Sequence, residues 1–250
     1  MNPKHYLTIG DLHGRRTWYH AVTPWVLRSP DHVVIFLGDY VDSFTVPLVE
    51  QRDNLTEVLA FQQLYPEQVV LLLGNHDAHY LWPDAPRGSG FSVAGHAVLH
   101  PIFRENAACF RLAYQHDTPD GQHYLWTHAG VSNAWLEAVP PFDAPVPVAT
   151  LADALNLMSE AGRLRPHLLT VGGARGGQGA GGPLWADAQE LTHPLPGYHQ
   201  IVGHTALLAG EPLVVVGNET TSVALCDYNE HAPTDEVVGP EWFYQLTLEL

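Results

Sequence analysis

An apolar run that ends abruptly in polar residues constrains the fold of this chain most strongly. Residues 69–73 read Val-Val-Leu-Leu-Leu, long enough for a strand buried on both faces, and Gly74 is followed at once by Asn75, His76 and Asp77. Doubly buried strands belong to helix-covered sheets, which bind ligands at the carboxyl ends of their strands. The pattern therefore predicts a site here. An ordinary polar turn is the alternative for this motif alone, because short motifs also arise by chance.

The segments around this strand alternate between strand-like and helix-like patterns. Apolar runs at residues 6–9 and 33–37 predict two further buried strands, and helical periodicity predicts helices over residues 15–27, interrupted or bent at Pro24, and 46–65. This alternation is typical of βαβ units, so we expect a largely parallel sheet in the N-terminal half.

The second half of the chain predicts more strands among loops. Residues 83–101 are rich in proline and glycine, so we expect a loop-rich insertion there that covers a site. A helix is expected over residues 148–161, after a proline-rich connection, and residues 172–182 are glycine-dense around Arg175. Strands are expected at residues 110–114, 123–127, 200–202, 213–216, 222–226 and 243–248. With no internal repeat, one domain over residues 1–250 is expected.

Composition excludes several classes of function. The net charge is −16 and Lys4 is the only lysine, so the surface repels the nucleic-acid backbone. No apolar run approaches the ~18 residues of a membrane span. Cys109 and Cys226 lack metal-finger spacing, which favours reduced thiols in a cytoplasmic protein. We expect neither nucleic acid nor membrane as a partner, and the sequence leaves the oligomeric state open.

Five predicted strand ends carry polar side chains beside a glycine, which lets the backbone turn tightly. The polar residues are Asp11 and His13, Asp39 and Asp42, Asn75 with His76 and Asp77, His128, and His204. Their oxygen and imidazole donors, without thiolates, suit Mn²⁺, Fe or Zn²⁺ better than a structural zinc site. So many such groups at one sheet edge would repel each other without a cation, and the set therefore predicts a metal centre.

The residues of these motifs and their order along the chain resemble those of the calcineurin-like metallophosphoesterases. The motifs are Gly10-Asp11-Leu12-His13-Gly14, Gly38-Asp39-Tyr40-Val41-Asp42, Gly74-Asn75-His76-Asp77, His128-Ala129-Gly130 and Gly203-His204-Thr205. They look most like the phosphoprotein-phosphatase branch, which includes bacterial and phage protein phosphatases and symmetrical diadenosine tetraphosphatases. The wider superfamily ends its last motif in a second histidine, where Ala206 stands here. The resemblance implies an α/β fold: two mixed β-sheets packed as a sandwich flanked by helices.

The resemblance also implies two divalent metal ions, with Mn²⁺ expected and Fe or Zn²⁺ as alternatives. The implied ligands are Asp11, His13 and Asp39 for one ion, and Asp39, Asn75, His128 and His204 for the other. Asp39 would then bridge the two. Paired cations can share a hydroxide, lower its pKa and clamp phosphoryl oxygens for in-line attack. They would supply the positive potential that the acidic chain lacks.

His76 has a different role in the family pattern. The histidine there protonates the leaving-group oxygen and is oriented by an aspartate that corresponds to Asp42. A carboxylate partner raises an imidazole pKa and fixes its tautomer, as a general acid requires. A histidine that only packs in a loop is the alternative. Asp77 is expected to support the turn, and His79 and Asp187 are either supporting groups or ordinary surface or core residues.

The second motif departs from the family at one position. Protein phosphatases of this branch continue it with Arg-Gly, and that arginine grips the phosphate, whereas Asp42 is followed here by Ser43-Phe44. Arg175 is the expected replacement as a phosphate-binding residue, beside Asn75, and a solvated loop arginine is the alternative.

The expected activity is hydrolysis of phosphomonoesters, with a phosphoprotein or a small phosphoester as substrate. Asp42 favours the protein serine/threonine phosphatase-like members, whereas His79 after the third motif resembles the diadenosine tetraphosphatases, so dinucleotide polyphosphate hydrolysis is the alternative. A non-catalytic scaffold is less expected because every implied ligand is present, and charge disfavours a nuclease. Arg15 and Arg16 fit the exposed side of a helix start, so no site role is expected for them.

Overall fold

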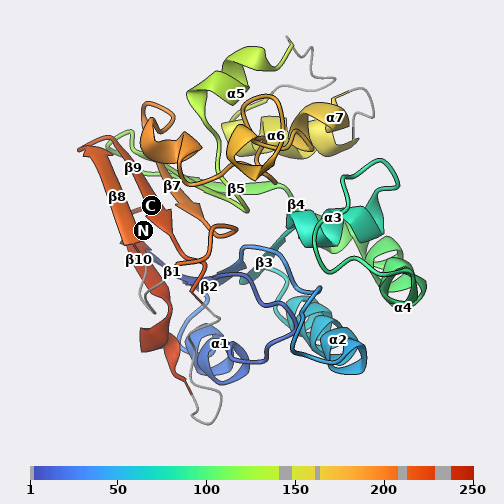
Figure 1. Cartoon of the computed structure of the whole chain (residues 1–250). Helices are drawn as coiled ribbons and strands as arrows, with labels where there is room; N and C mark the ends of the chain where they lie inside the picture. Colours follow the sequence, from blue (N-terminus) through green and yellow to red (C-terminus); the bar gives the residue numbers. More distant parts are fainter. Residues whose placement is uncertain (1–2, 141–147, 161–163, 208–212, 229–237) are drawn as a thin grey trace.

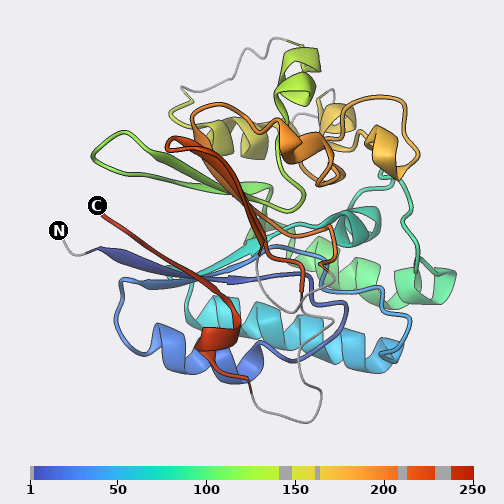
Figure 2. The same ribbon diagram turned by 60° about the vertical axis from the view of Figure 1, so that its left-hand side comes forward.

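The computed structural model describes residues 3–140, 148–160, 164–207, 213–228 and 238–250. In this part of the chain two five-stranded β-sheets lie face to face, with helices on the outer side of each (Figure 1). The expected α/β sandwich of two mixed sheets is therefore confirmed. The chain ends lie near each other at one side of the molecule (Figure 2), since the first and last strands pair.

The first sheet is the parallel sheet that the N-terminal pattern predicts. Its strands, in spatial order, are β10 (Tyr244–Leu248), β1 (Lys4–Ile9), β2 (His32–Phe36), β3 (Val69–Leu72) and β4 (Phe110–Arg111). All neighbours are parallel except the edge pair β10 and β1. Helices α1 (Tyr19–Val26) and α2 (Leu48–Leu64) cover its outer face (Figure 1).

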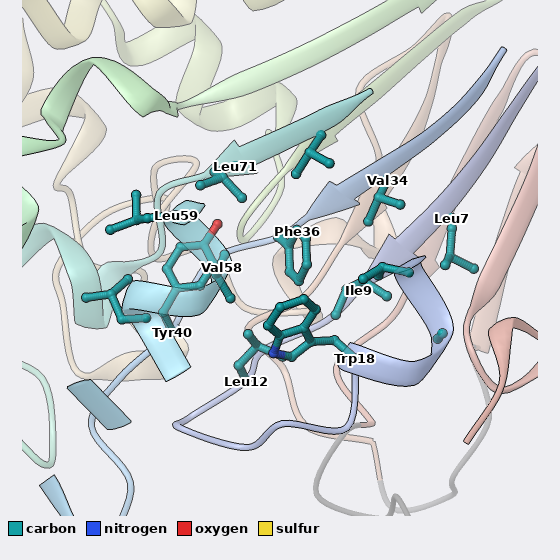
Figure 3. Packing of buried hydrophobic residues seen from close by; sticks show 14 of the residues in the cluster. Leu7, Ile9, Leu12, Trp18, Val34, Phe36, Tyr40, Val58, Leu59 and Leu71 are labelled. Atoms are coloured by element: carbon teal, nitrogen blue, oxygen red, sulfur yellow. The ribbon is translucent and has the colours of Figure 1, made fainter. Parts of the chain in front are cut away.

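Large apolar side chains fill the space between this sheet and its helices (Figure 3). Val34, Phe36 and Leu71 of the strands pack in one buried cluster with Trp18 and Val58. The Trp18 and Phe36 rings meet edge to face, with centroids 5.5 Å apart. Burial of each such side chain contributes about 1.5–3 kcal/mol. The strands are thus fixed firmly up to their carboxyl ends.

The second sheet combines parallel and antiparallel neighbours. Its strands, in spatial order, are β5 (Ala113–Asp117), β6 (His123–Thr127), β7 (Tyr198–Val202), β9 (Thr221–Leu225) and β8 (Leu213–Asn218). Helices α5 (Asn133–Ala138), α6 (Leu151–Glu160) and α7 (Arg165–Leu168) lie on its outer side (Figure 1). Between the sheets, the indole Nε1 of Trp126 donates to Thr8 Oγ1 at 3.0 Å, so β6 is tied directly to β1.

The expected loop over residues 83–101 is only half correct. Helix α4 (Val93–Glu105) occupies the second part of this segment, and the first part is loop. Ser92 caps the helix by accepting a bond from Gly95 N at 2.9 Å. A Cβ at Gly95 would lie 2.9 Å from Tyr80 Oη, so this glycine permits close packing instead of breaking the helix.

One expected strand, residues 110–114, is in fact two. β4 ends at Arg111 in the first sheet, and β5 begins at Ala113 in the second. At the crossing, the amides of Leu112 and Ala113 both donate to Asn156 Oδ1, at 2.7 and 3.2 Å. The side chain of Asn156 thus replaces the ladder bonds that a continuous strand would make.

The remaining predicted elements agree with the structure apart from their ends. Helix α1 begins at Tyr19, four residues later than expected, and contains Pro24. The last residue of the predicted helix over 148–161, and the proline-rich stretch 141–147, lie outside the described residues. Among the residues that are described, no helix combines the length and apolar character needed to cross a membrane.

Candidate metal centre and active site

The carboxyl ends of strands from both sheets converge on one cavity. The loops after β1, β2 and β3 bring Asp11, His13, Asp39, Asp42, Asn75 and His76 to it, and the loop after β7 brings His204. His128, after β6, is fully buried and does not line the cavity itself, but its donor atom lies within 4.8 Å of those of Asp39 and His204. The cavity measures about 270 Å³. All the metal ligands predicted from the sequence are therefore neighbours in space, although they are up to 193 positions apart in the chain.

The backbone is strained at four of these positions. Among the described residues, the non-glycine residues with positive φ are His13 (43°), Asp39 (52°), Asp42 (65°) and His204 (66°). A side chain in this region costs about 1–3 kcal/mol and persists only where surrounding contacts enforce it. The strain is thus confined to residues predicted to form the site.

The first group of donors surrounds His128. The ring Nδ1 of His128 donates to the carbonyl of Leu37 at 2.9 Å, which leaves a lone pair on Nε2. That Nε2 lies 2.9 Å from Asn75 Oδ1, 3.1 Å from His204 Nδ1 and 3.5 Å from Asp39 Oδ2. Burial lowers the pKa of His128 and lowers that of His204 well below its usual value, so both rings are neutral. Two imidazole nitrogens, an amide oxygen and a carboxylate oxygen therefore face one another, a set of donor atoms suited to a cation.

The second group shares Asp39 with the first. Donor atoms of Asp11, His13 and Asp39 all lie within 4.8 Å of one another. His13 Nδ1 donates to the carbonyl of Val41 at 2.9 Å, so its Nε2 also carries a lone pair, 3.9 Å from Asp39 Oδ2. The residues present thus fit two neighbouring cations, with Asp39 common to both sets of ligands.

The charges of the two central carboxylates are set by different surroundings. Burial, followed by the charges of Asp227 and Asp39, raises the pKa of Asp11 well above its usual value. Burial also acts to raise the pKa of Asp39, but the positive charge that the nearby imidazoles carry when protonated, with His128 foremost, acts to hold it below the usual range. A cation would relieve the repulsion between these carboxylates.

Asp77 does not face the centre; it supports the loops that carry the site residues. Its carboxylate accepts bonds from the amides of Asp39 (2.7 Å), Gly74 (2.9 Å) and Tyr40 (2.9 Å). It thereby caps helix α3 (Asn75–Leu81), which the sequence reading missed because a helix of seven residues is too short to show periodicity. Asn75 and His76 are consequently the first two residues of a helix.

His76 and Asp42 are paired as expected. His76 Nδ1 donates to Asp42 Oδ2 at 3.1 Å. Burial acts to lower the pKa of His76, but the carboxylates of Asp39 and Asp42 raise it to about 9. Glycine backbone lies directly against this pair: a Cβ at Gly88 would be 3.1 Å from the His76 ring, and one at Gly90 would be 3.0 Å from Asp42 Cβ. The loop before α4 therefore covers the pair.

Two further side chains of α3 hold Asp42. His79 Nε2 lies 2.8 Å from Asp42 Oδ2, and the hydroxyl of Tyr80 donates to Asp42 Oδ1 at 2.5 Å. His79 Nδ1 accepts from Gly88 N at 3.3 Å, which leaves the proton on Nε2, toward Asp42. The sequence reading left His79 open and missed Tyr80. Helical spacing from His76 is the signal that would have found both, once α3 was known.

Two arginines line the cavity, of which the sequence predicts only Arg175. Arg175 lines it, held by Asp187 Oδ2 (2.9 Å from Nε) and by donation from Nη2 to Thr205 Oγ1 (3.0 Å). Asp187 is thus a supporting group. Arg15 also lines the cavity and precedes α1 by four residues, so its expected position on the exposed side of a helix start is wrong. Arg16 is exposed and pairs with Glu57, as a surface residue.

The comparisons with known proteins identify the family of this chain. Residues 5–207 match the family model described as calcineurin-like phosphoesterase. The chain belongs to the calcineurin-like phosphoesterase family, and it is a metal-dependent phosphoesterase.

One solved structure and the curated proteins complete the comparison. The chain is similar to a protein serine/threonine phosphatase from Saccharomyces cerevisiae with similarity to human phosphatase PP5. The identity is 14% and the TM-score 0.46, over 99% of this chain and 80% of that one. No curated protein matches the sequence. Family membership therefore rests on the family model.

Proposed function

We propose that the protein hydrolyses phosphomonoesters at a dinuclear metal centre, with Mn²⁺ as the expected ion. The proposed ligands are Asp11, His13 and Asp39 for one ion, and Asp39, Asn75, His128 and His204 for the other. The observation that carries the proposal is the lone pair of His128 Nε2. It faces the acceptor oxygens of Asn75 and Asp39 and a ring nitrogen of His204 in a buried site, and Asp39 belongs to both donor groups.

The chain and the ions would divide the chemistry between them. When bound, two divalent ions supply an activated water and positive charge for the phosphoryl oxygens. His76 is proposed to hold a proton on Nε2 and to give it to the leaving-group oxygen, with Asp42 fixing the ring through Nδ1. His79 and Tyr80 keep the Asp42 carboxylate in place.

Arg175 and Asn75 are the proposed phosphate contacts. Asp187 and Thr205 fix the guanidinium of Arg175 through Nε and Nη2, and no hydrogen bond within the described chain uses Nη1. That nitrogen is available to phosphoryl oxygens. The proposed substrates are phosphoproteins, serine or threonine esters among them, or small phosphoesters. Dinucleotide polyphosphates are the alternative substrates. His79 is the residue that resembles the diadenosine tetraphosphatases, and it is part of the site because it contacts the Asp42 carboxylate.

Metal stoichiometry tests the dinuclear centre. Wild-type protein loaded with Mn²⁺ and desalted should contain two ions per chain by elemental analysis and should hydrolyse p-nitrophenyl phosphate. Asp39→Asn, which keeps the side-chain shape, should retain at most one ion and lose activity. Asp117→Asn, at an exposed carboxylate outside the site, is the matched control and should retain both. One ion or none in the wild type contradicts the dinuclear proposal.

A further inference from the structure

Phe44 lines the cavity although it is largely exposed. It stands where the related phosphatases carry the glycine of Asp-Arg-Gly, and 82% of it is exposed, the largest fraction among the large hydrophobic side chains described. The predicted metal ligand His204, by contrast, is only 8% exposed and Asp39 only 1%. Phe44 thus lies at the solvent end of a cavity whose other end is polar and buried. Because small-molecule sites are typically lined by aromatic side chains, this ring is available to a ligand that enters the cavity.

The loop that carries Phe44 is firmly held. Gln51, a buried residue of α2, accepts from Asp42 N at 2.8 Å and donates to the carbonyl of Val46 at 2.7 Å. Ser43 Oγ also accepts from the amide of Val46, at 3.0 Å. Both ends of the loop are therefore fixed to the protein, so the exposure of Phe44 is a feature of the folded backbone.

Other residues add apolar surface to the same cavity. Trp185 and Ala206 line it together with Phe44. The Trp185 ring lies edge-on to the His204 imidazole, with centroids 5.9 Å apart. The volume of about 270 Å³ is just below the range of about 300–1,000 Å³ typical of small-molecule sites. A phosphoryl group and one attached ring match this size better than a phosphoryl group, a sugar and a base.

We infer that Phe44 is a specificity-determining residue that binds a flat aromatic group esterified directly to the phosphate, so that aryl phosphates are preferred substrates. The inference rests on the proposed function, because it concerns the leaving-group side of the same site. Aromatic rings attract each other in offset or edge-to-face contacts and exclude water from one another's faces. Alkyl phosphates, such as phosphoserine or glycerol 2-phosphate, cannot make this contact.

The test compares Phe44→Ala with the wild type on matched esters. Aryl esters react faster intrinsically, so the quantity to measure is the change that the variant causes for each substrate. We expect Phe44→Ala to lower kcat/KM for phenyl phosphate and phosphotyrosine roughly 3- to 10-fold and to leave glycerol 2-phosphate within about 2-fold. Phe44→Tyr should retain the aryl preference. Val93→Ala, at a side chain 81% exposed outside the cavity, is the control and should change nothing.

A binding measurement separates this inference from the proposed activity. Mn²⁺-loaded protein is titrated with phenylphosphonate and with methylphosphonate, which need no turnover. Weaker binding of phenylphosphonate alone in Phe44→Ala supports the aromatic contact. Equal changes for both ligands, or none, overturn it while leaving the phosphatase proposal intact. If Phe44→Ala loses AMP hydrolysis but keeps phenyl phosphate hydrolysis, the inference is also overturned, because Phe44 then contacts a nucleobase. Absence of all turnover with phenylphosphonate binding retained contradicts the proposed function alone.

Discussion

The carboxylate of Asp77 accepts a hydrogen bond from the backbone amide of Asp39 at 2.7 Å. In return, the Asp39 carboxylate accepts from the amide of His76 at 2.9 Å. These two bonds join the loop after β2 to the start of α3, and they hold Asp39 at a φ of 52°. The residue proposed to bridge two cations is therefore positioned by its neighbours before any ion binds.

Asp77→Asn should weaken both the fold and the centre. The amide keeps the shape, but its NH₂ group cannot accept, so at least one buried N–H among those of Asp39, Gly74 and Tyr40 loses its partner. An unpaired buried donor costs about 1–3 kcal/mol. Urea unfolding should show this loss, and Mn²⁺ titration should show weaker binding. Asp117→Asn is the surface control. Unchanged stability and metal affinity would show that the carboxylate does not hold the loop.

His76→Asn should separate proton transfer from metal binding. Loss of a general acid lowers kcat by about 10²–10⁴. The effect should be largest for alkyl phosphates, whose leaving oxygen needs a proton, and smaller for nitrophenyl phosphate. Metal content should stay at the wild-type value, and His123→Asn, on the far end of β6, should have normal kcat. Equal losses on both kinds of ester would rule out a general acid.

The stability of the metal-free protein should depend on pH through His76. Carboxylates raise its pKa from 6.5 to about 9 in the folded state, against the effect of burial. A raised pKa means that the stabilising charge is fully present below about pH 6.5 and is lost as pH rises through about 9. After chelation, wild type should therefore exceed His76→Asn in free energy of unfolding more at pH 6 than at pH 10. A difference that is independent of pH would contradict this assignment.

The sequence predicts the residues that form the site better than the residues that hold them in place. Asp11 and Asp39 follow neighbouring parallel strands of the first sheet, and His128 and His204 follow neighbouring parallel strands of the second, so the order of elements groups the residues within each sheet. That the two sheets pack together and bring both groups to one site is what the family resemblance implies. The hydrogen bond from Tyr80 to Asp42 depends on α3, whose seven residues leave no periodic pattern. Arg15 was misplaced because the start of α1 was set too early.

The errors in the fold arose where tertiary contacts override local pattern. Gly95 looked like a loop residue, yet it is glycine because Tyr80 packs against its Cα in α4. The break between β4 and β5 depends on Asn156, which lies more than forty positions later in the chain. No local pattern carries that information.

Tyr80→Phe should change the general acid through Asp42. Without the Tyr80 hydroxyl, the Asp42 carboxylate loses its bond at 2.5 Å and becomes a stronger acceptor for His76. The pKa of His76 then rises, so the alkaline limb of the kcat–pH profile should move to higher pH. Loss of one hydrogen bond to a charged group should also cost about 1.5–3 kcal/mol of stability. Tyr124→Phe is the control, and an unshifted profile with lower stability would leave Tyr80 a packing residue only.

Removal of metal from the buried site should lower the stability of the folded protein measurably. Donor atoms of His128, His204 and Asn75 converge with Asp39 only in the folded chain, so an ion bound there would bind the native state and not the unfolded chain. Ligands that bind only the native state stabilise by about 2.7 kcal/mol at 100 times their Kd. The Tm should fall on chelation with EDTA and recover with added Mn²⁺ in proportion to its logarithm. Asp39→Asn should respond more weakly than wild type, whereas Asp117→Asn should respond equally. A Tm that changes with neither EDTA nor Mn²⁺ would show that these side chains hold no exchangeable ion.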